Sequence, residues 1–114
     1  MGFKIDRIAS NFVKEISYIL ANEIRDQDIH FVTVTDCHVT NDLSFAKVYV
    51  TVLDDSKRDV TLKALNDASS YIRRLLADRV DIRHIPELTF VYDESIEYGQ
   101  KIEEIIEDIH NNED

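Results

Sequence analysis

Basic, amide and aromatic side chains recur along one side of residues 3–25, a segment with the period of an amphipathic helix. At roughly 100° per residue, six of them fall within about 80° of one another: Arg7, Asn11, Lys14, Tyr18, Asn22 and Arg25. No acidic residue falls in this stripe. Cationic side chains bind phosphate oxygens, amides bind sugar hydroxyls, and a tyrosine ring can stack on a base. The pattern therefore indicates an RNA-binding face, with an ordinary solvated helix face as the alternative.

A second group of basic residues follows a run of small residues, Ala68-Ser69-Ser70, inside another helical segment. Adjacent serines weaken a helix because their hydroxyls compete for backbone groups, so we expect a kink or break there. The freed N–H groups of the second half-helix would favour an anion. Further phosphate contacts could come from four arginines: Arg73, Arg74, Arg79 and Arg83. The alternative is that these arginines pair with Asp67, Asp78 or Asp81 on the helix surface.

Catalytic and metal-binding patterns are absent from the sequence. Gly2 and Gly99 are the only glycines, which excludes a glycine-rich phosphate loop. No cysteine pair has zinc-ligand spacing, and the four histidines are scattered. Cys37, the single cysteine, is expected to be a small apolar filler of a strand. Because no nucleophile, base and orienting group come together, the sequence predicts a protein that is not an enzyme and has no cofactor or metal.

The net charge of −10 argues against nucleic acid when the chain is taken whole. Its distribution is uneven, however. Residues 93–114 carry nine acids and one base, whereas residues 1–92 carry 14 acids and 12 bases. Basic patches are therefore possible in the first four-fifths of the chain. There is no apolar stretch long enough to span a membrane and no secretory signal, and one cysteine fits a reducing cytosol, so we expect a cytoplasmic protein.

Apolar periodicity predicts the elements that position these residues. Residues 30–39 and 45–53 are expected to form a hairpin, whose second strand turns Ala46, Val48 and Val50 inward and Lys47 and Tyr49 outward. Helical patterns cover 3–25, 56–80 with its break, and 93–110, and a third strand covers 88–92. The fold class predicted is α+β in the order α-β-β-α-(kink)-α-β-α, with a three-stranded mixed sheet and helices packed on one face. Residues 1–93 form the domain, and 94–114 form an acidic C-terminal helix and tail.

Several runs of residues resemble a known family, the ribosome-binding factor A family. The matching runs are Val32-Thr33-Val34-Thr35, Asn41-Asp42-Leu43, Ala46-Lys47-Val48-Tyr49-Val50, Ala68-Ser69-Ser70-Tyr71-Ile72-Arg73 and Arg83-His84-Ile85-Pro86-Glu87-Leu88-Thr89-Phe90, ending in Tyr92-Asp93. The resemblance covers about residues 5 to 106. It implies a type II KH-like domain in which a short Ala-x-Gly break between two helices replaces the usual GXXG loop. This chain has Ser70 at the glycine position, so a gentler kink is expected.

The resemblance further implies a non-enzymatic factor that binds the small (30S) ribosomal subunit and 16S rRNA, and assists late subunit maturation and rRNA processing, including cold adaptation. The side chains expected to contact phosphate are Arg7, Lys14, Arg25, Lys47, Arg73, Arg74, Arg79 and Arg83. Tyr18 or Tyr49 could stack on bases, and Ala68, Ser69 and Ser70 would form the helix break. We expect a monomer with no DNA or membrane partner. The alternative is a KH-like module that binds a ribosomal protein or an assembly factor.

Overall fold

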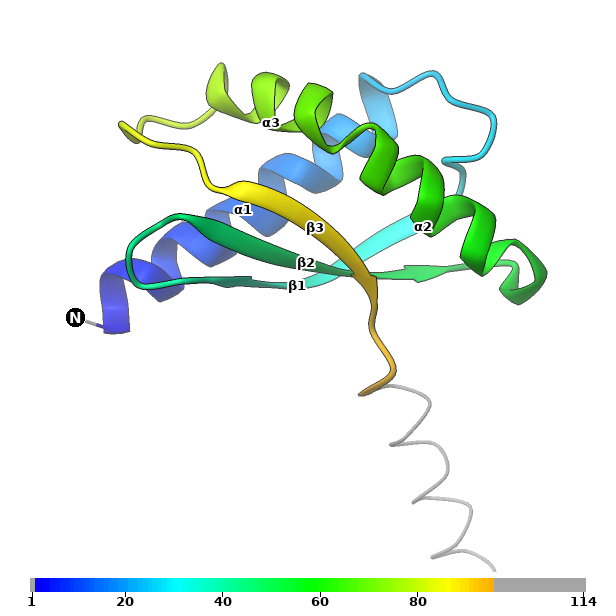
Figure 1. Cartoon of the computed structure of the whole chain (residues 1–114), viewed down its shortest axis with the longest axis horizontal. Helices are drawn as coiled ribbons and strands as arrows, with labels where there is room; N and C mark the ends of the chain where they lie inside the picture. The colour runs from blue at the N-terminus through cyan, green and yellow to red at the C-terminus, as the bar shows by residue number, and fades with distance from the viewer. Residues whose placement is uncertain (1, 96–114) are drawn as a thin grey trace, which may run out of the picture.

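The computed structural model describes residues 2–95, and their side chains from residue 4 onward. The elements follow the predicted order, with one short 3₁₀ turn added before the second helix (Figure 1). They are α1 (Gly2–Asn22), β1 (Val32–Val39), β2 (Phe45–Val52), η1 (Asp55–Lys57), α2 (Arg58–Asp67), α3 (Ser69–Ala77) and β3 (Glu87–Tyr92). The predicted helix over 93–110 lies outside the described residues beyond Ser95.

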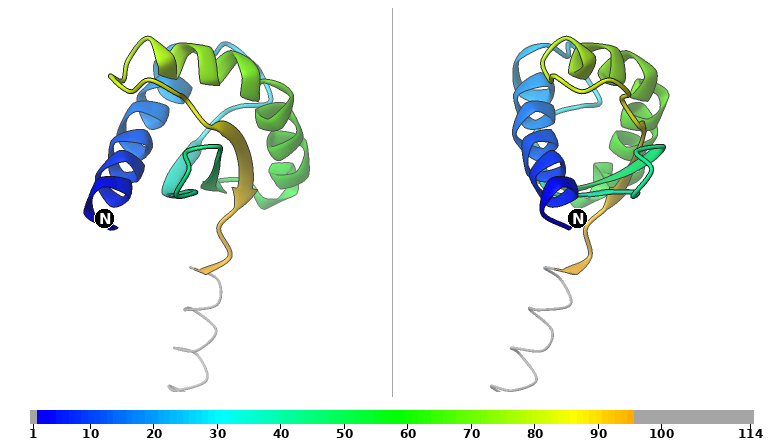
Figure 2. Two further views of the ribbon diagram at one scale, coloured as in Figure 1. Left: turned by 60° about the vertical axis from the view of Figure 1, so that its left-hand side comes forward. Right: turned by 90° about the vertical axis from the view of Figure 1, so that its left-hand side faces the viewer.

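The three strands form one mixed sheet in the order β1-β2-β3. β1 and β2 are antiparallel, and β3 runs parallel to β2, as expected for a strand that arrives over a helical crossover. All three helices cover the same face: α1 and α2 flank it and α3 crosses above (Figure 2). The predicted α+β class with a three-stranded mixed sheet is thus confirmed.

The core lies between this sheet face and the helices. Ala46, Val48 and Val50 are buried, as the alternation along β2 predicts. Phe12 and Ile16 of α1 are also fully covered. Further buried apolar side chains come from α1, α2, α3 and β3 and include Ile19, Leu65, Ile72, Leu76, Leu88 and Phe90. The described helices leave the opposite sheet face uncovered, and Lys47 is exposed there.

A β-bulge interrupts β1 between Val34 and Asp36. The extra residue, Thr35, changes which side chains point inward, so Val34 is buried before the bulge and Cys37 after it. The bulge also aims the Thr35 hydroxyl at the chain end of β3, where it donates a 2.5 Å hydrogen bond to Asp93 Oδ2. Hydrogen bonds from Ser95 and Thr35 to the carboxylate lower the pKa of Asp93. The two outer strands are therefore tied together across β2.

Asn66 of α2 completes the outer edge of β3. Its Nδ2 donates to the Phe90 carbonyl at 3.0 Å, and its Oδ1 accepts from the Phe90 N–H at 2.8 Å. The amide group thus makes the two hydrogen bonds that a neighbouring strand would make. This contact fixes α2 against the sheet at the helix end nearest the break.

We predict that Asn66→Ala lowers the free energy of unfolding by roughly 1–3 kcal/mol, because it leaves the backbone groups of Phe90 without partners. Urea denaturation followed by circular dichroism measures this. Asn11→Ala is the matched control, since it makes the same change on an exposed helix position and should be neutral or slightly stabilising. Equal stabilities for the two variants would contradict the role assigned to Asn66.

Candidate nucleic-acid interface

The stripe on α1 is exposed, as the sequence predicts. Arg7, Asn11 and Lys14 all face solvent on the side away from the buried Phe12 and Ile16. The helix ends at Asn22, three residues earlier than expected, and the Asn22 amide donates to the Tyr18 carbonyl at 3.1 Å. Arg25 therefore lies in the loop that follows α1, where it is also exposed.

Arg79 lies just after α3 and bridges two carboxylates, Glu15 on α1 and Glu23 directly after α1. Its Nε is 2.6 Å from Glu15 Oε2, and its Nη1 is 3.3 Å from Glu23 Oε1. The guanidinium also lies over the Tyr18 ring, 4.1 Å from the ring centroid. The hydrogen bond to Glu15 is the main cause that raises the pKa of Arg79. Among the described residues its partners are thus on α1 and directly after it, not the acids near Arg79 in sequence. One face of the Tyr18 ring is occupied by the guanidinium.

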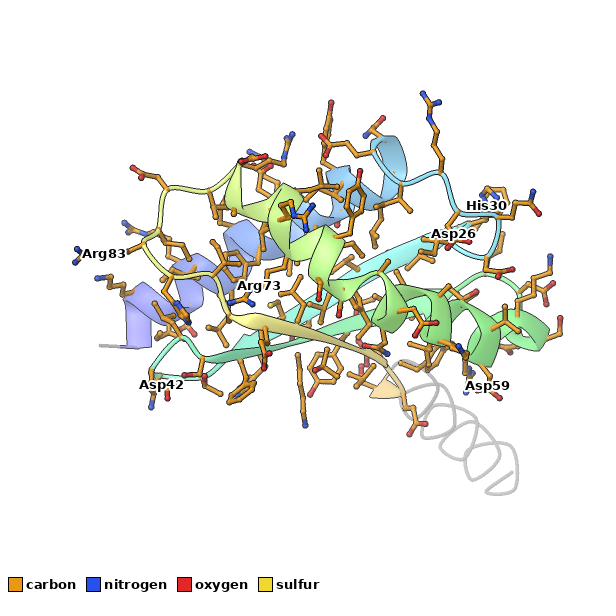
Figure 3. All side chains as sticks on the ribbon, turned by 45° about the horizontal axis from the view of Figure 1, so that its top comes forward. Asp26, His30, Asp42, Asp59, Arg73 and Arg83 are labelled. Atoms are coloured by element: carbon orange, nitrogen blue, oxygen red, sulfur yellow. The ribbon has the colours of Figure 1, made fainter. Side chains whose placement is uncertain are left out.

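Arg73 is also engaged inside the molecule. Its Nε and Nη2 donate to the carbonyl of Ile85 at 3.0 and 2.6 Å, respectively. Ile85 precedes Pro86 in the loop that leads into β3, so the guanidinium fastens that loop to α3 (Figure 3). Arg74, its neighbour, points outward and is exposed. Of this adjacent pair, Arg74 is the one available to an external phosphate.

The predicted helix break is present at Ala68, which separates α2 from α3. No side chain caps the start of α3, and its first turn holds no acidic residue. A helix start without a side-chain cap can present N–H groups to an acceptor. The hollows on either side of the break include more carboxylates than bases, however: Glu23, Asp26, Asp28 and Asp67 against Arg25 and Lys63. Lys63 is paired with Asp67 at 2.9 Å.

Seven of the eight predicted basic residues lie on α1, α3 or the loops that follow these helices. Lys47 is the exception, on the open face of the sheet with the half-buried Tyr49. Within residues 4–95, no acid pairs with five exposed bases: Arg7, Lys14, Arg25, Arg74 and Arg83. The helical side of the molecule thus offers a set of basic side chains that no described acid neutralises. Arg73 and Arg79 instead make contacts within the molecule.

The chain matches the family of ribosome-binding factor A over residues 4–106. A relative from Staphylococcus epidermidis, ribosome-binding factor A, is 48% identical over 112 residues that cover 97% of each chain. Another, from Staphylococcus carnosus, is 48% identical over 94% of each chain. The chain belongs to the ribosome-binding factor A family.

Solved structures of family members share the fold. The crystal structure of ribosome-binding factor A from Thermus thermophilus superposes with a TM-score of 0.69, at 22% identity, covering 77% of this chain and 93% of that one. A homology model of the Thermus thermophilus factor, fitted into a cryo-EM map of its complex with the 30S subunit, gives 0.67 at 22% identity, covering 79% and 96%. The Thermotoga maritima protein TM0855, a solution structure, gives 0.59 at 27% identity, covering 74% and 85%.

The break of this ribosome-binding factor A family member is made without glycine. Ala68 has φ −91° and ψ 3°, which any L-residue can adopt. Within the described residues, positive φ occurs at Phe31 and Leu43, so Ser70 is not in the left-handed region. Serine at position 70 is therefore compatible with a break at Ala68 between α2 and α3.

Two groups that often carry chemistry are not arranged for it. Cys37 is buried, and burial, assisted by the charge of Asp36, raises its pKa to about 12. In the part of the chain that the structure describes, no three His, Cys, Asp or Glu side chains come together as metal ligands. No helix there is long and apolar enough to cross a membrane.

Sequence reasoning missed three contacts that shape this region. Arg58 stacks on the Tyr92 ring, with its guanidinium carbon 3.6 Å from the centroid, and pairs with Asp55. The other two are the ion pairs of Arg79 with Glu15 and Glu23 and the hydrogen bonds from Arg73 to the Ile85 carbonyl. Each joins residues of different elements, and spacing along the chain carries no signal for such pairs.

We predict that Arg73→Ala lowers the free energy of unfolding by roughly 1–3 kcal/mol, because the loop carbonyl loses a charged donor. Arg74→Ala, one position along the same helix and exposed, should stay within about 0.5 kcal/mol of the parent. Thermal and urea unfolding of the two variants measure the contrast. If both variants are as stable as the parent, the contact between Arg73 and the Ile85 carbonyl does not stabilise the fold.

We predict that the Cys37 thiol reacts with a disulfide reagent at pH 8 at least about a hundredfold more slowly in the folded protein than in guanidinium chloride, since little thiolate forms below the raised pKa. The raised pKa also makes the free energy of unfolding depend on pH. A raised thiol pKa favours the fold below the unfolded value of roughly 8.5, and this contribution is lost as the pH rises from there toward the folded pKa of about 12. Similar rates in the two states would show that the site opens.

Proposed function

We propose that the protein binds the free small (30S) ribosomal subunit, contacts 16S rRNA and assists late subunit maturation and rRNA processing, including at low temperature. It acts by binding alone, in the cytoplasm and as a monomer, and makes or breaks no covalent bond. The observation that carries the proposal is the family match over residues 4–106, with relatives 48% identical along nearly the whole chain. The Thermus thermophilus factor fitted into a 30S complex supports the choice of subunit.

The proposed rRNA contacts are the open bases of the helical side. Arg7 and Lys14 project from α1 and Arg74 from α3, and Arg83 follows in the loop toward β3. Guanidinium and ammonium groups at such positions bind phosphate oxygens without reading base identity, which suits recognition of a folded RNA by its backbone. Arg73 and Arg79 act indirectly, since they hold the loop and the two helices in place.

A net charge of −10 does not prevent this contact. The helix α1 has 21 residues, so it is roughly 30 Å long at about 1.5 Å per residue. At physiological ionic strength, charges are screened over about 8 Å. Carboxylates beyond the end of α1 are therefore more than two screening lengths from Arg7 and more than one from Lys14 along the helix axis. The local balance of charge decides whether polyanion can approach.

We predict that the double variant Lys14→Glu, Arg74→Glu binds small subunits at least tenfold more weakly, or about 1.4 kcal/mol, with its melting temperature nearly unchanged. The slope of log affinity against log salt should also become shallower by about one to two, because fewer phosphates are neutralised. Sedimentation with purified small subunits across a salt series measures both quantities.

Lys63→Glu is the matched control for this experiment. It reverses an exposed base on a helix, α2, that is not part of the proposed contact, and it should bind like the parent. If the double variant keeps the parent's affinity and salt slope, the outer sides of α1 and α3 are not the rRNA contact. Failure of the parent itself to sediment with small subunits would contradict the function as a whole.

A second function, binding to a protein rather than to rRNA, is favoured by one observation. The end of the molecule that carries the loop after α1 combines exposed apolar side chains with carboxylates, which is unsuitable for RNA. The two functions are compatible, because this end and the open bases of α1 and α3 are different surfaces.

A further inference from the structure

Exposed apolar side chains gather where β1 begins and β2 ends. The Phe31 side chain is 77% exposed, Leu53 is 78% exposed and Val60, on the first turn of α2, is 51% exposed. Phe31 and Leu53 are adjacent, since the Leu53 N–H donates to the Phe31 carbonyl at 3.2 Å. They line a hollow of about 330 Å³ together with Val52 and Thr61. We call Phe31, Leu53 and this hollow the apolar end; Val60 lines a second hollow that shares Asp28 with it.

The backbone at Phe31 is strained in a way that the fold does not explain. Its φ is 53°, a conformation that favours glycine and is unusual for a bulky residue. Leu43, the other described residue with positive φ, packs its side chain against the core, and this burial offsets the strain. Phe31 has no such compensation, because its ring faces solvent. Uncompensated strain of this kind is typical of sites with a binding role.

The rim of the apolar end is acidic. Residues 25–31 and 53–60 carry five carboxylates, Asp26, Asp28, Asp54, Asp55 and Asp59, against three bases, Arg25, Lys57 and Arg58. The Arg58 guanidinium pairs with Asp55 and lies over Tyr92, so it is directed toward β3. Figure 3 shows Asp26, His30 and Asp59 at this end of the molecule, while Asp42 and Arg83 are at the opposite end.

This charge selects among possible occupants. A nucleic-acid backbone would be repelled by the carboxylates. So would residues 96–114 of the chain itself, which carry seven acids and one base. A segment rich in lysine and arginine would be attracted, and an apolar side chain within it would fill the hollow and cover Phe31 and Leu53.

We infer that the apolar end is a docking site for a basic protein segment with an apolar anchor residue. We further assign that segment to a ribosomal protein of the small subunit, which rests on the function proposed above. The anchor lies in the hollow against Phe31 and Leu53, and the flanking basic side chains pair with the carboxylates of the rim.

A peptide tests the chemistry without the ribosome. The probe has Leu-Phe flanked on each side by three lysines or arginines, and it is titrated into ¹⁵N-labelled protein. The expected result is a set of saturable amide shifts confined to residues 27–31, 52–57 and 60–61, which weaken with salt. A control peptide with Ala-Ala at the centre should bind at least tenfold more weakly. Shifts elsewhere, no shifts, or equal binding of the control would overturn the inference.

The double variant Phe31→Gly, Leu53→Gln tests the same surface on the ribosome. Glycine suits the positive φ, so this variant should fold as stably as the parent. Phe45→Thr is the matched control, since it removes an exposed phenylalanine from the open face of the sheet. Binding is measured to intact small subunits and to protein-free 16S rRNA.

The double variant should bind intact subunits about tenfold or more weakly and protein-free rRNA as well as the parent, while the control matches the parent on both. Weaker binding to both would mean that Phe31 stacks on RNA, and unchanged binding to both would mean that the surface is not used; either overturns the inference. A dimer of the parent that the double variant disperses would make a second copy the occupant and would also overturn it. If the parent does not bind subunits, the proposed function fails, and the peptide titration still decides the chemistry of the site.

Discussion

The bridge from Arg79 to Glu15 and Glu23 sets how the two helices of the candidate interface lie relative to each other. Apolar burial beneath α1 and α3 supplies most of the stabilising free energy, but it is non-directional and fixes their relative position only loosely. Two carboxylates eight positions apart, Glu15 on α1 and Glu23 directly after it, and a planar guanidinium over Tyr18 restrict how α3 can lie against α1. The ion pairs are partly exposed, so their main effect is on register rather than on stability.

The parts of the fold that could be predicted from the sequence are those governed by local periodicity. The apolar stripe containing Phe12 and Ile16 and the alternation along β2 each follow from one element meeting one core. The small residues at 68–70 located the helix break correctly because helix propensity is also a local property. The bulge at Thr35 could not be predicted from local periodicity. The hydrogen-bond partner of Thr35 is Asp93, which follows β3 at the opposite edge of the sheet.

The candidate site was harder to predict than the fold, and the reason is physical. An arginine is recognised in a sequence as a charge, whereas its availability depends on what the fold brings to it. Arg73 and Arg74 are adjacent and chemically identical, yet one is held by the Ile85 carbonyl 12 residues away and the other faces solvent. Arg79 finds its partners 56 and 64 residues away. Helical spacing therefore predicted the open bases of α1 well and those near the break only in part.

The two proposed contacts lie on one domain, and this affects how strongly the protein can hold a large particle. Each contact is small: a few open bases on α1 and α3, and one apolar hollow with an acidic rim. Once one contact forms, the other becomes intramolecular, and its effective concentration rises to roughly millimolar or above. The pair can then be tight although each alone is weak.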